Sequence, residues 1–410
     1  MDIINFLSGT DLAERNDRLQ AKDNAQLSFE VLLEGELPER YAVAAFVAGL
    51  HRSPVAEFYF DLLGDENPGL MQPVAEAVAA GLDTWGSGPS EQGQARWFSA
   101  ATLPHADSLG QRLVAALDFS HFLVFHPVDS TPERLAALAK VFTEDETVTL
   151  AQLISFLAFQ LRVVHGLVLL DGRETAPLPA PASTAPAITV ASDEGSAPTA
   201  LTGGAYEVLT YPHLVEPSHF VHHSLGWKPW VPILGEEELT EAHLEAMILP
   251  ERAKSAYFRL LARDPQALKA RTLTDLDIFY NIDTGIGRAE RELAATVASR
   301  LNGCIYCASV HSARTLEEST GRVADVERLL DQGVGADLGS DTWNSIRDTT
   351  VALTRTPIDF GQRHVHQLKA LGLETGDMID IINAAAFFNW ANRLMLSLGA
   401  AEVPRRFRNH

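Results

Sequence analysis

The sequence has little positive charge. Its 410 residues contain 32 Lys and Arg against 54 Asp and Glu, which gives a formal net charge of −22. Proteins that bind nucleic acid or anionic membranes use basic side chains to displace counterions, and this chain has no basic surface to offer. We therefore expect neither a nucleic acid nor a membrane as a partner. The negative charge is expected to serve solubility.

The sequence also lacks a secretory leader and a long uncharged apolar run. Its opening, MDIINFLSGTDLAERND, has no basic leader, no long apolar stretch and no small-residue cleavage site. Residues 147–170 are the most apolar, but Arg162 and His165 interrupt them. The longest uncharged run there is shorter than the ~20 residues that a bilayer requires. A buried core helix is expected.

Cysteine is nearly absent, and so is the alternation of apolar and polar residues that is typical of strands. Cys304 and Cys307 are the only cysteines. Two cysteines cannot form the disulfide framework of a small extracellular protein, so a cytoplasmic location is expected. Ala-rich segments with apolar residues at helical spacing predict an all-α fold. The clearest helices are expected at 39–51, 131–142, 289–301, 323–333 and 375–399.

One change in composition divides the chain. Residues 174–200 are rich in Pro, Ala, Ser and Thr and contain almost no large apolar side chain. Such a segment buries too little surface to offset the entropy of ordering it, which predicts an extended linker. We therefore expect a helical domain at 1–173, a linker at 174–204 and a second helical domain at 205–410.

The two halves resemble each other weakly. An ungapped alignment of residues 38–60 with 289–311 matches Glu39 with Glu290, Arg40 with Arg291, Ala44 with Ala295 and Leu50 with Leu301. The alignment supports a duplication. It also sets Tyr41 opposite Glu292, Ser53 opposite Cys304, Ala56 opposite Cys307 and Phe60 opposite His311. A reactive thiol site is therefore expected only in the second half.

Both cysteines stand at the predicted start of a helix. Asn302-Gly303 is a helix-ending and turn signal, and Cys304, Cys307 and His311 follow at i, i+3 and i+7, on one helix face. A helix N-terminus favours a thiolate, and a neighbouring imidazole can take the proton. Two thiols at this spacing can cycle between dithiol and disulfide. Glu290 or Glu292 on the preceding helix can reach His311 and orient it.

Other readings of these residues remain open. The cysteines can be inert core residues, which pack as small hydrophobes. Two cysteines, a histidine and a carboxylate can also bind a metal, although no second CxxC or HxxxH completes a structural zinc site. The helical flanks disfavour a thioredoxin fold, which needs a βαβ context.

The stretch GRAERELAATVASRLNGCIYCASVHSA resembles the AhpD-like alkylhydroperoxidases of the carboxymuconolactone decarboxylase superfamily. The resemblance covers roughly residues 205–405 and selects Glu292, twelve residues before Cys304, as the glutamate of the motif. It implies that Cys307 attacks the peroxide, that Cys304 resolves the product to a disulfide, and that Glu292 and His311 relay protons. It further implies an external thiol donor and no haem, flavin or metal cofactor.

The sequence departs from the family pattern at one position. The resemblance also has one consequence for assembly. The best-known peroxidases of the group have a histidine directly before the second cysteine, where this chain has Tyr306. One arm of the proton relay is therefore absent or altered. The first half looks like a cysteine-free, degenerate relative of the same superfamily, so the chain is expected to contain two AhpD-like helical domains in tandem. The resemblance also implies that the chains form a homo-oligomer, with a trimer of chains as the expected assembly.

Two further functions stay open beside the peroxidase. One is an acid–base enzyme of the carboxymuconolactone decarboxylase type that uses Glu292 and His311. The other is a redox-sensing binding or scaffold protein. The His- and Trp-rich segment 211–232 is expected to pack or mediate contacts, although a metal site is conceivable. Asn389, Asn392 and Arg393 are expected in a structural network or in the wall of the redox pocket. Tyr257 and Phe258 are expected in the core.

Overall fold

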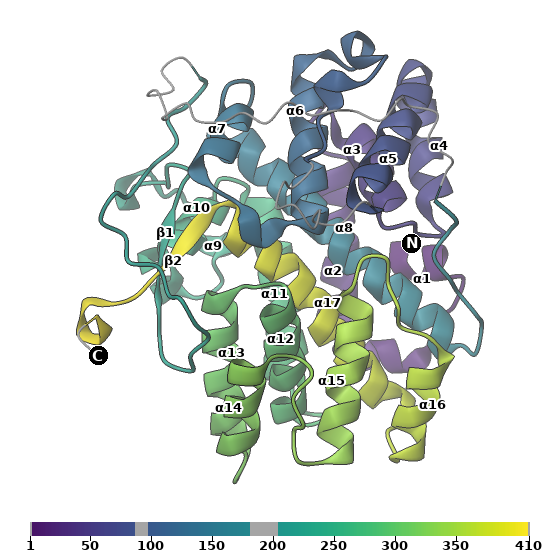
Figure 1. Cartoon of the computed structure of the whole chain (residues 1–410), viewed down its shortest axis with the longest axis vertical. Helices are drawn as coiled ribbons and strands as arrows, with labels where there is room; N and C mark the ends of the chain where they lie inside the picture. The colour runs from purple at the N-terminus through teal and green to yellow at the C-terminus, as the bar shows by residue number, and fades with distance from the viewer. Residues whose placement is uncertain (1, 87–96, 181–203, 409–410) are drawn as a thin grey trace.

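The computed structural model describes residues 2–86, 97–180 and 204–408, and α-helices dominate it (Figure 1). The prediction of an all-α fold is confirmed. The first half contains α1 (Ile3–Ser8), α2 (Leu19–Leu33), α3 (Arg40–Leu50), α4 (Ala56–Glu66), α5 (Met71–Gly86), α6 (Ala106–Phe125), α7 (Pro132–Ala139) and α8 (Glu144–Leu170). The second contains α9 (Glu241–Ala246), α10 (Ala256–Leu261), α11 (Pro265–Tyr280), α12 (Arg288–Leu301), α13 (Ile305–Glu318), α14 (Val323–Gln332), α15 (Asp341–Thr354), α16 (Gln362–Ala370) and α17 (Thr375–Ser397).

Side-chain caps fix several of these helix ends. Thr131 accepts a hydrogen bond from the Arg134 amide at the start of α7, and Thr143 and Glu146 form a capping box at the start of α8. Gly333 follows the end of α14 with a φ of 85°. These are the local signals that make the helix positions predictable from the sequence.

A short antiparallel pair of strands lies beside the C-terminus (Figure 1). β1 (Gly226–Pro229) pairs with β2 (Gly399–Glu402), with Gly226 opposite Glu402. Four residues in each strand are too few to give a clear alternation in the sequence. The pair fastens the segment before α9 to the end of α17.

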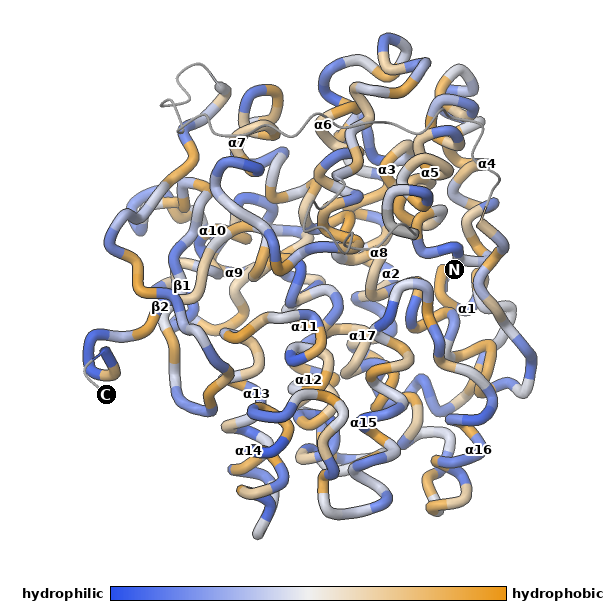
Figure 2. Tube along the Cα trace, viewed as in Figure 1, coloured by the Kyte–Doolittle hydropathy of each residue, from blue (hydrophilic) through white to orange (hydrophobic). Residues whose placement is uncertain are grey.

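α8 and α17 form the centre of the molecule. They pack against each other, and Figure 2 shows hydrophobic residues along both. Gly166 of α8 permits a close approach, because a Cβ there would lie 2.8 Å from Cδ1 of Ile382. Among the described residues, α8 is the one helix long and apolar enough to cross a membrane, and 94% of its apolar window is buried inside the protein. The expectation of a core helix over 147–170 agrees with that burial.

The two halves have the same order of helices. α2 to α8 and α11 to α17 are runs of seven, and the equivalent helices α2 and α11 pack together, as do α8 and α17. In Figure 1 the first run lies mainly in the upper part and the second in the lower part, and α8 and α17 cross the middle. Buried residues from both halves form one continuous hydrophobic core.

Equivalent residues make equivalent contacts across the boundary between the halves. Arg162 of α8 donates to the carbonyl of Thr354 at the end of α15, at 2.8 Å. Arg393 of α17 donates to the carbonyl of Val124 near the end of α6, at 3.2 Å. Each arginine also donates to the carbonyl four residues before it. Each half therefore donates an arginine hydrogen bond to a backbone carbonyl of the other half.

The predicted linker falls mostly outside the described residues, which exclude 181–203. Its beginning is held in place, because the amide of Leu178 donates to the carbonyl of Arg52 at 2.7 Å.

Candidate active site

The turn between α12 and α13 places both cysteines. Asn302 ends α12, Gly303 has a φ of 79°, and Cys304 forms the N-cap of α13. A Cβ on Gly303 would lie 2.6 Å from Cγ2 of Val128, which belongs to the first half. Glycine is therefore required both by the backbone conformation and by close contact with the other half.

The two cysteines are free, and their sulfur atoms are in contact. The Sγ atoms lie 2.7 Å apart, with Cys304 donating to Cys307, and the residues are only 1% and 5% exposed. Burial raises the pKa of the Cys304 thiol well above its ordinary value, and Asn392 opposes this shift. The expectation that the helix N-terminus favours a thiolate is wrong for Cys304, because desolvation outweighs the helix dipole. A protonated Cys304 instead donates a hydrogen bond to the sulfur of Cys307.

Glu292 and His311 form a buried acid–base pair. Nδ1 of His311 lies 2.5 Å from Oε2 of Glu292, whose side chain is fully buried. Arg288, one turn before Glu292, donates from Nε to Oε1 at 3.3 Å and bridges to Glu318 at 2.9 Å. Because the carboxylate engages Nδ1, Nε2 of His311 is left to exchange a proton. Glu290 takes a different role and accepts from the indole of Trp343.

Aromatic rings from two other helices fix the imidazole. The ring of His311 lies 4.1 Å from that of Phe388 on α17 and 5.7 Å from that of Phe279 on α11, measured between centroids. These rings exclude water from one side of the pair. They strengthen the His311–Glu292 interaction by lowering the local dielectric.

An asparagine network holds the turn that carries the cysteines. Asn302 donates from Nδ2 to Oδ1 of Asn392 at 2.9 Å, and Asn392 donates to Ser299 at 3.0 Å. Asn389 accepts from Asn302 and from Arg393. Asn389, Asn392 and Arg393, which the sequence placed either in a structural network or in the wall of the redox pocket, form a network. Asn392 also lowers the pKa of Cys304 through a hydrogen bond.

Sequence reasoning overlooked Arg288, Asn302 as a network member, and Phe388. Arg288 had a usable signal, because it precedes Glu292 by four residues on one helix face. Phe388 had none, since it comes from a helix 77 positions after His311 in the chain, 388 minus 311. Tyr306 lies beside the thiols, and burial, followed by both cysteines, raises the pKa of its hydroxyl.

The His-rich segment does not form a metal site in the described part of the chain. There, no three His, Cys, Asp or Glu side chains are grouped to hold a metal ion. The segment packs instead: Trp230 is buried, Trp227 donates to the Met395 carbonyl at 3.0 Å, and His223 stacks on Phe407 at 4.0 Å.

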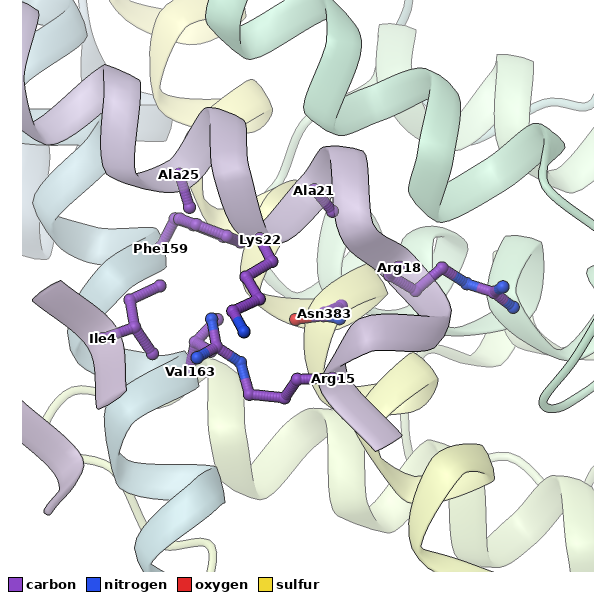
Figure 3. Close-up of a pocket in the computed structure, with 9 residues that line it drawn as sticks. All are labelled: Ile4, Arg15, Arg18, Ala21, Lys22, Ala25, Phe159, Val163 and Asn383. Carbon is purple, nitrogen blue, oxygen red and sulfur yellow. The ribbon is translucent and has the colours of Figure 1, made fainter. Parts of the chain in front are cut away.

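Two cavities lie away from the cysteines. One, of about 440 Å³, is lined mainly by α6 and α7, with Trp97, Phe98 and Arg134 among its walls. The other, of about 10 Å³, lies between α1, α2, α8 and α17, where Arg15 and Lys22 point inward and Arg18 points away (Figure 3). The smaller cavity has room for about one water molecule.

Residues 265–337 match the Carboxymuconolactone decarboxylase family. The matched segment runs from α11 to just beyond α14 and includes Glu292, Cys304, Cys307 and His311. No curated protein and no solved structure matches the chain.

Proposed function

We propose that this protein is a thiol-dependent hydroperoxidase whose active site is made by Glu292, Cys304, Cys307 and His311. The single observation that carries the proposal is the arrangement on α12 and α13: two free cysteines in contact, beside a histidine held by a buried glutamate. The match to the Carboxymuconolactone decarboxylase family is compatible with this chemistry and does not by itself select it.

The chemistry follows from these four groups. The Cys307 thiolate attacks the terminal oxygen of a hydroperoxide, the O–O bond breaks, and the alcohol leaves with a proton supplied through His311. Cys307 is then a sulfenic acid. The Cys304 sulfur attacks it, the S–S bond forms, and hydroxide leaves with the Cys304 proton as water. Two thiols and one hydroperoxide thus give a disulfide, an alcohol and water.

An external dithiol must then reduce the disulfide, so we propose a thiol or disulfide-reductase partner in a reducing cytoplasm. The reaction needs no haem, flavin or metal. The missing relay histidine at Tyr306 leaves His311 and Glu292 as the proton path.

We also propose that the chain is a fusion of two modules and that the first has no thiol chemistry. The repeated helix order and the exchanged arginine contacts of Arg162 and Arg393 support a duplication. We propose further that the chains assemble as a homo-oligomer, with a trimer as the expected form; light scattering on the purified protein measures its mass.

The test is consumption of tert-butyl hydroperoxide with dithiothreitol as donor. Wild type is expected to turn over, and Cys307→Ser is expected to lose at least about 1000-fold in rate, because an alcohol cannot replace the thiolate nucleophile. Ala56→Ser, at the equivalent position of the first half, is the matched control and is expected to keep the wild-type rate. Equal rates in wild type and Cys307→Ser would overturn the proposal.

The family match favours a second candidate, an acid–base enzyme acting on a carbon substrate. In that case Glu292 and His311 would move the proton and the thiols would be dispensable. Activity on a muconolactone that survives in the Cys304→Ser/Cys307→Ser double variant would support it over the peroxidase.

A further inference from the structure

Among the described residues, no carboxylate lies within ion-pair distance of the buried cation Arg271. It lies on α11 within the matched family segment and is only 5% exposed. Among the described residues its guanidinium makes no hydrogen bond or ion pair, and Nε is completely shielded. Three aromatic rings surround it, with Cζ 4.9 Å from the centroid of Phe387, 5.7 Å from that of Tyr257 and 5.8 Å from that of Trp390. A guanidinium in such a place normally meets a carboxylate or phosphate.

The hydroxyl of Tyr257 is a second unpartnered polar group beside Arg271. Its Oη atom is buried and has no hydrogen-bond partner among the described residues. The charged groups close enough to act on this hydroxyl are Arg271, Cys307, Asp275 and Cys304, so it lies in the neighbourhood of both the guanidinium and the thiols. The tyrosine ring packs against the core.

The nearest carboxylates to Arg271 are shared with other cations. Asp275, one turn further along α11, is influenced by Arg271, His311 and Arg252, and burial raises the pKa of its carboxyl group. Arg271 therefore shares Asp275 with Arg252, on which Glu251 also acts. Glu292 is already engaged by His311 and Arg288 and does not pair with Arg271.

We propose that Arg271 and Tyr257 form a binding subsite for the carboxylate of the substrate, so that the enzyme prefers hydroperoxides that carry a carboxylate. The inference rests on the proposed peroxidase function and names its substrate class. The planar guanidinium presents two parallel N–H donors that match a carboxylate, and the tyrosine hydroxyl adds a third. The carboxylate is unchanged by the reaction and holds the O–OH group near Cys307.

The kinetic test compares cumene hydroperoxide with its para-carboxylate, which differ only in the charged group. Wild type is expected to show a higher kcat/KM for the carboxylate. The ratio of the two kcat/KM values is expected to fall about 10- to 100-fold in Arg271→Met and about 3- to 10-fold in Tyr257→Phe, which removes one oxygen from an unpartnered hydroxyl. Lys269→Met, on the exposed face of the same helix, is the matched control and keeps the ratio.

A binding measurement separates this inference from the peroxidase proposal. Calorimetric titration with 4-isopropylbenzoate, which has no peroxide group, reports the subsite even if neither hydroperoxide is consumed. Binding that weakens at least 10-fold in Arg271→Met and is restored only partly by Arg271→Lys supports the subsite. The subsite would be overturned if Tyr257→Phe bound 4-isopropylbenzoate as tightly as wild type and also kept the wild-type ratio of the two kcat/KM values. Absence of binding to wild type would overturn it as well. Thermal unfolding shows that each variant is folded before it is scored.

Discussion

The two halves build the same turn and place different chemistry on it. In the first half Arg52 has a φ of 52°, and the amide of Ser53 donates to the carbonyl of Ala48 at 3.1 Å. In the second half Gly303 has a φ of 79°, and the amide of Cys304 donates to the carbonyl of Ser299 at 2.9 Å. Both halves therefore share the same backbone turn. The thiols are an addition to it, so the turn alone does not imply a redox site.

The first half supports the site without contributing a reactive group. Val128 packs on Gly303, and the carbonyl of Val124 accepts from Arg393, which in turn donates to Asn389 of the network behind the cysteines. Opposite Glu292 and His311 the first half has Tyr41 and Phe60, which cannot move a proton at neutral pH. Its contacts with Gly303 and Arg393 hold parts of the second half in place.

The largest expected effect comes from Glu292→Gln. This change removes the carboxylate that the first half also lacks at the aligned position, Tyr41. The amide cannot balance an imidazolium at His311, so the peroxidase kcat/KM is expected to fall about 100- to 10,000-fold. Glu290→Gln, two residues earlier on α12, keeps an oxygen for Trp343 and is expected to stay within about threefold of wild type. Steady-state kinetics on both variants provide the measurement, and a similar loss in both would remove Glu292 from the relay.

Trp390 and Phe159 test whether the central helices are equivalent. Their ring centroids lie 5.7 Å apart where α17 crosses α8. Truncation of either to Ala should reduce the free energy of unfolding by about 3–5 kcal/mol, because each leaves a cavity in the shared core. Trp390→Ala is also expected to lower peroxidase activity, since the indole packs on Arg271, whereas Phe159→Ala is not. Urea unfolding and kinetics check both statements, and unequal destabilisation would argue against equivalent roles.

Asp380 gives the second half a pH response. Its counterpart in the first half, by the register that pairs Arg162 with Arg393, is Thr149, which does not titrate. Burial raises the pKa of Asp380 to about 6 although Arg18 lies 2.8 Å away. The unfolded value is about 3.9, so folding favours the protonated form. Its contribution to stability is complete below about pH 4 and is lost as pH rises through about 6. The loss amounts to about 3 kcal/mol.

Urea unfolding of wild type and Asp380→Asn from pH 4 to pH 7 measures this contribution. The free energy of unfolding of wild type is expected to fall relative to the variant as pH rises. A constant difference between wild type and Asp380→Asn across this range would mean that Asp380 has an ordinary pKa.

The smallest effects are expected at the two turns themselves. Gly303→Ala should cost about 1–3 kcal/mol in the free energy of unfolding, from left-handed backbone strain and the contact with Val128. It should also lower activity by moving the cysteines. Arg52→Gly relaxes the same conformation and should change stability by less than about 1 kcal/mol without affecting activity. Denaturant titration compares them, and an equal cost at both positions would contradict the special role of Gly303.

Local signals in the sequence account for the helices and for part of the site. The Asn302-Gly303 turn, the start of α13 and the upstream position of Glu292 are all separated by short, regular spacings that a helix converts into proximity. Thr131, Thr143 and Gly333 mark helix ends in the same local way.

The contacts made by distant helices could not be predicted from the sequence. Arg271, Tyr257 and Phe388 come from α11, α10 and α17, and no spacing rule links these helices to α13. The raised pKa of Cys304 could not be predicted for the same reason, since the desolvation that raises it comes from tertiary packing. The packing of α2 on α11 and of α8 on α17 likewise depends on which apolar faces meet, which a single sequence does not reveal.

A single-turnover reaction tests the central claim most directly. Reduced protein is mixed with one equivalent of tert-butyl hydroperoxide, and free thiols, tert-butyl alcohol and the Cys304–Cys307 peptide link are measured by thiol titration and mass spectrometry. The account predicts loss of both thiols per chain, one alcohol formed and a Cys304–Cys307 disulfide, with Cys304→Ser stopping at a sulfenic acid on Cys307. Both thiols remaining free while the hydroperoxide persists would contradict it.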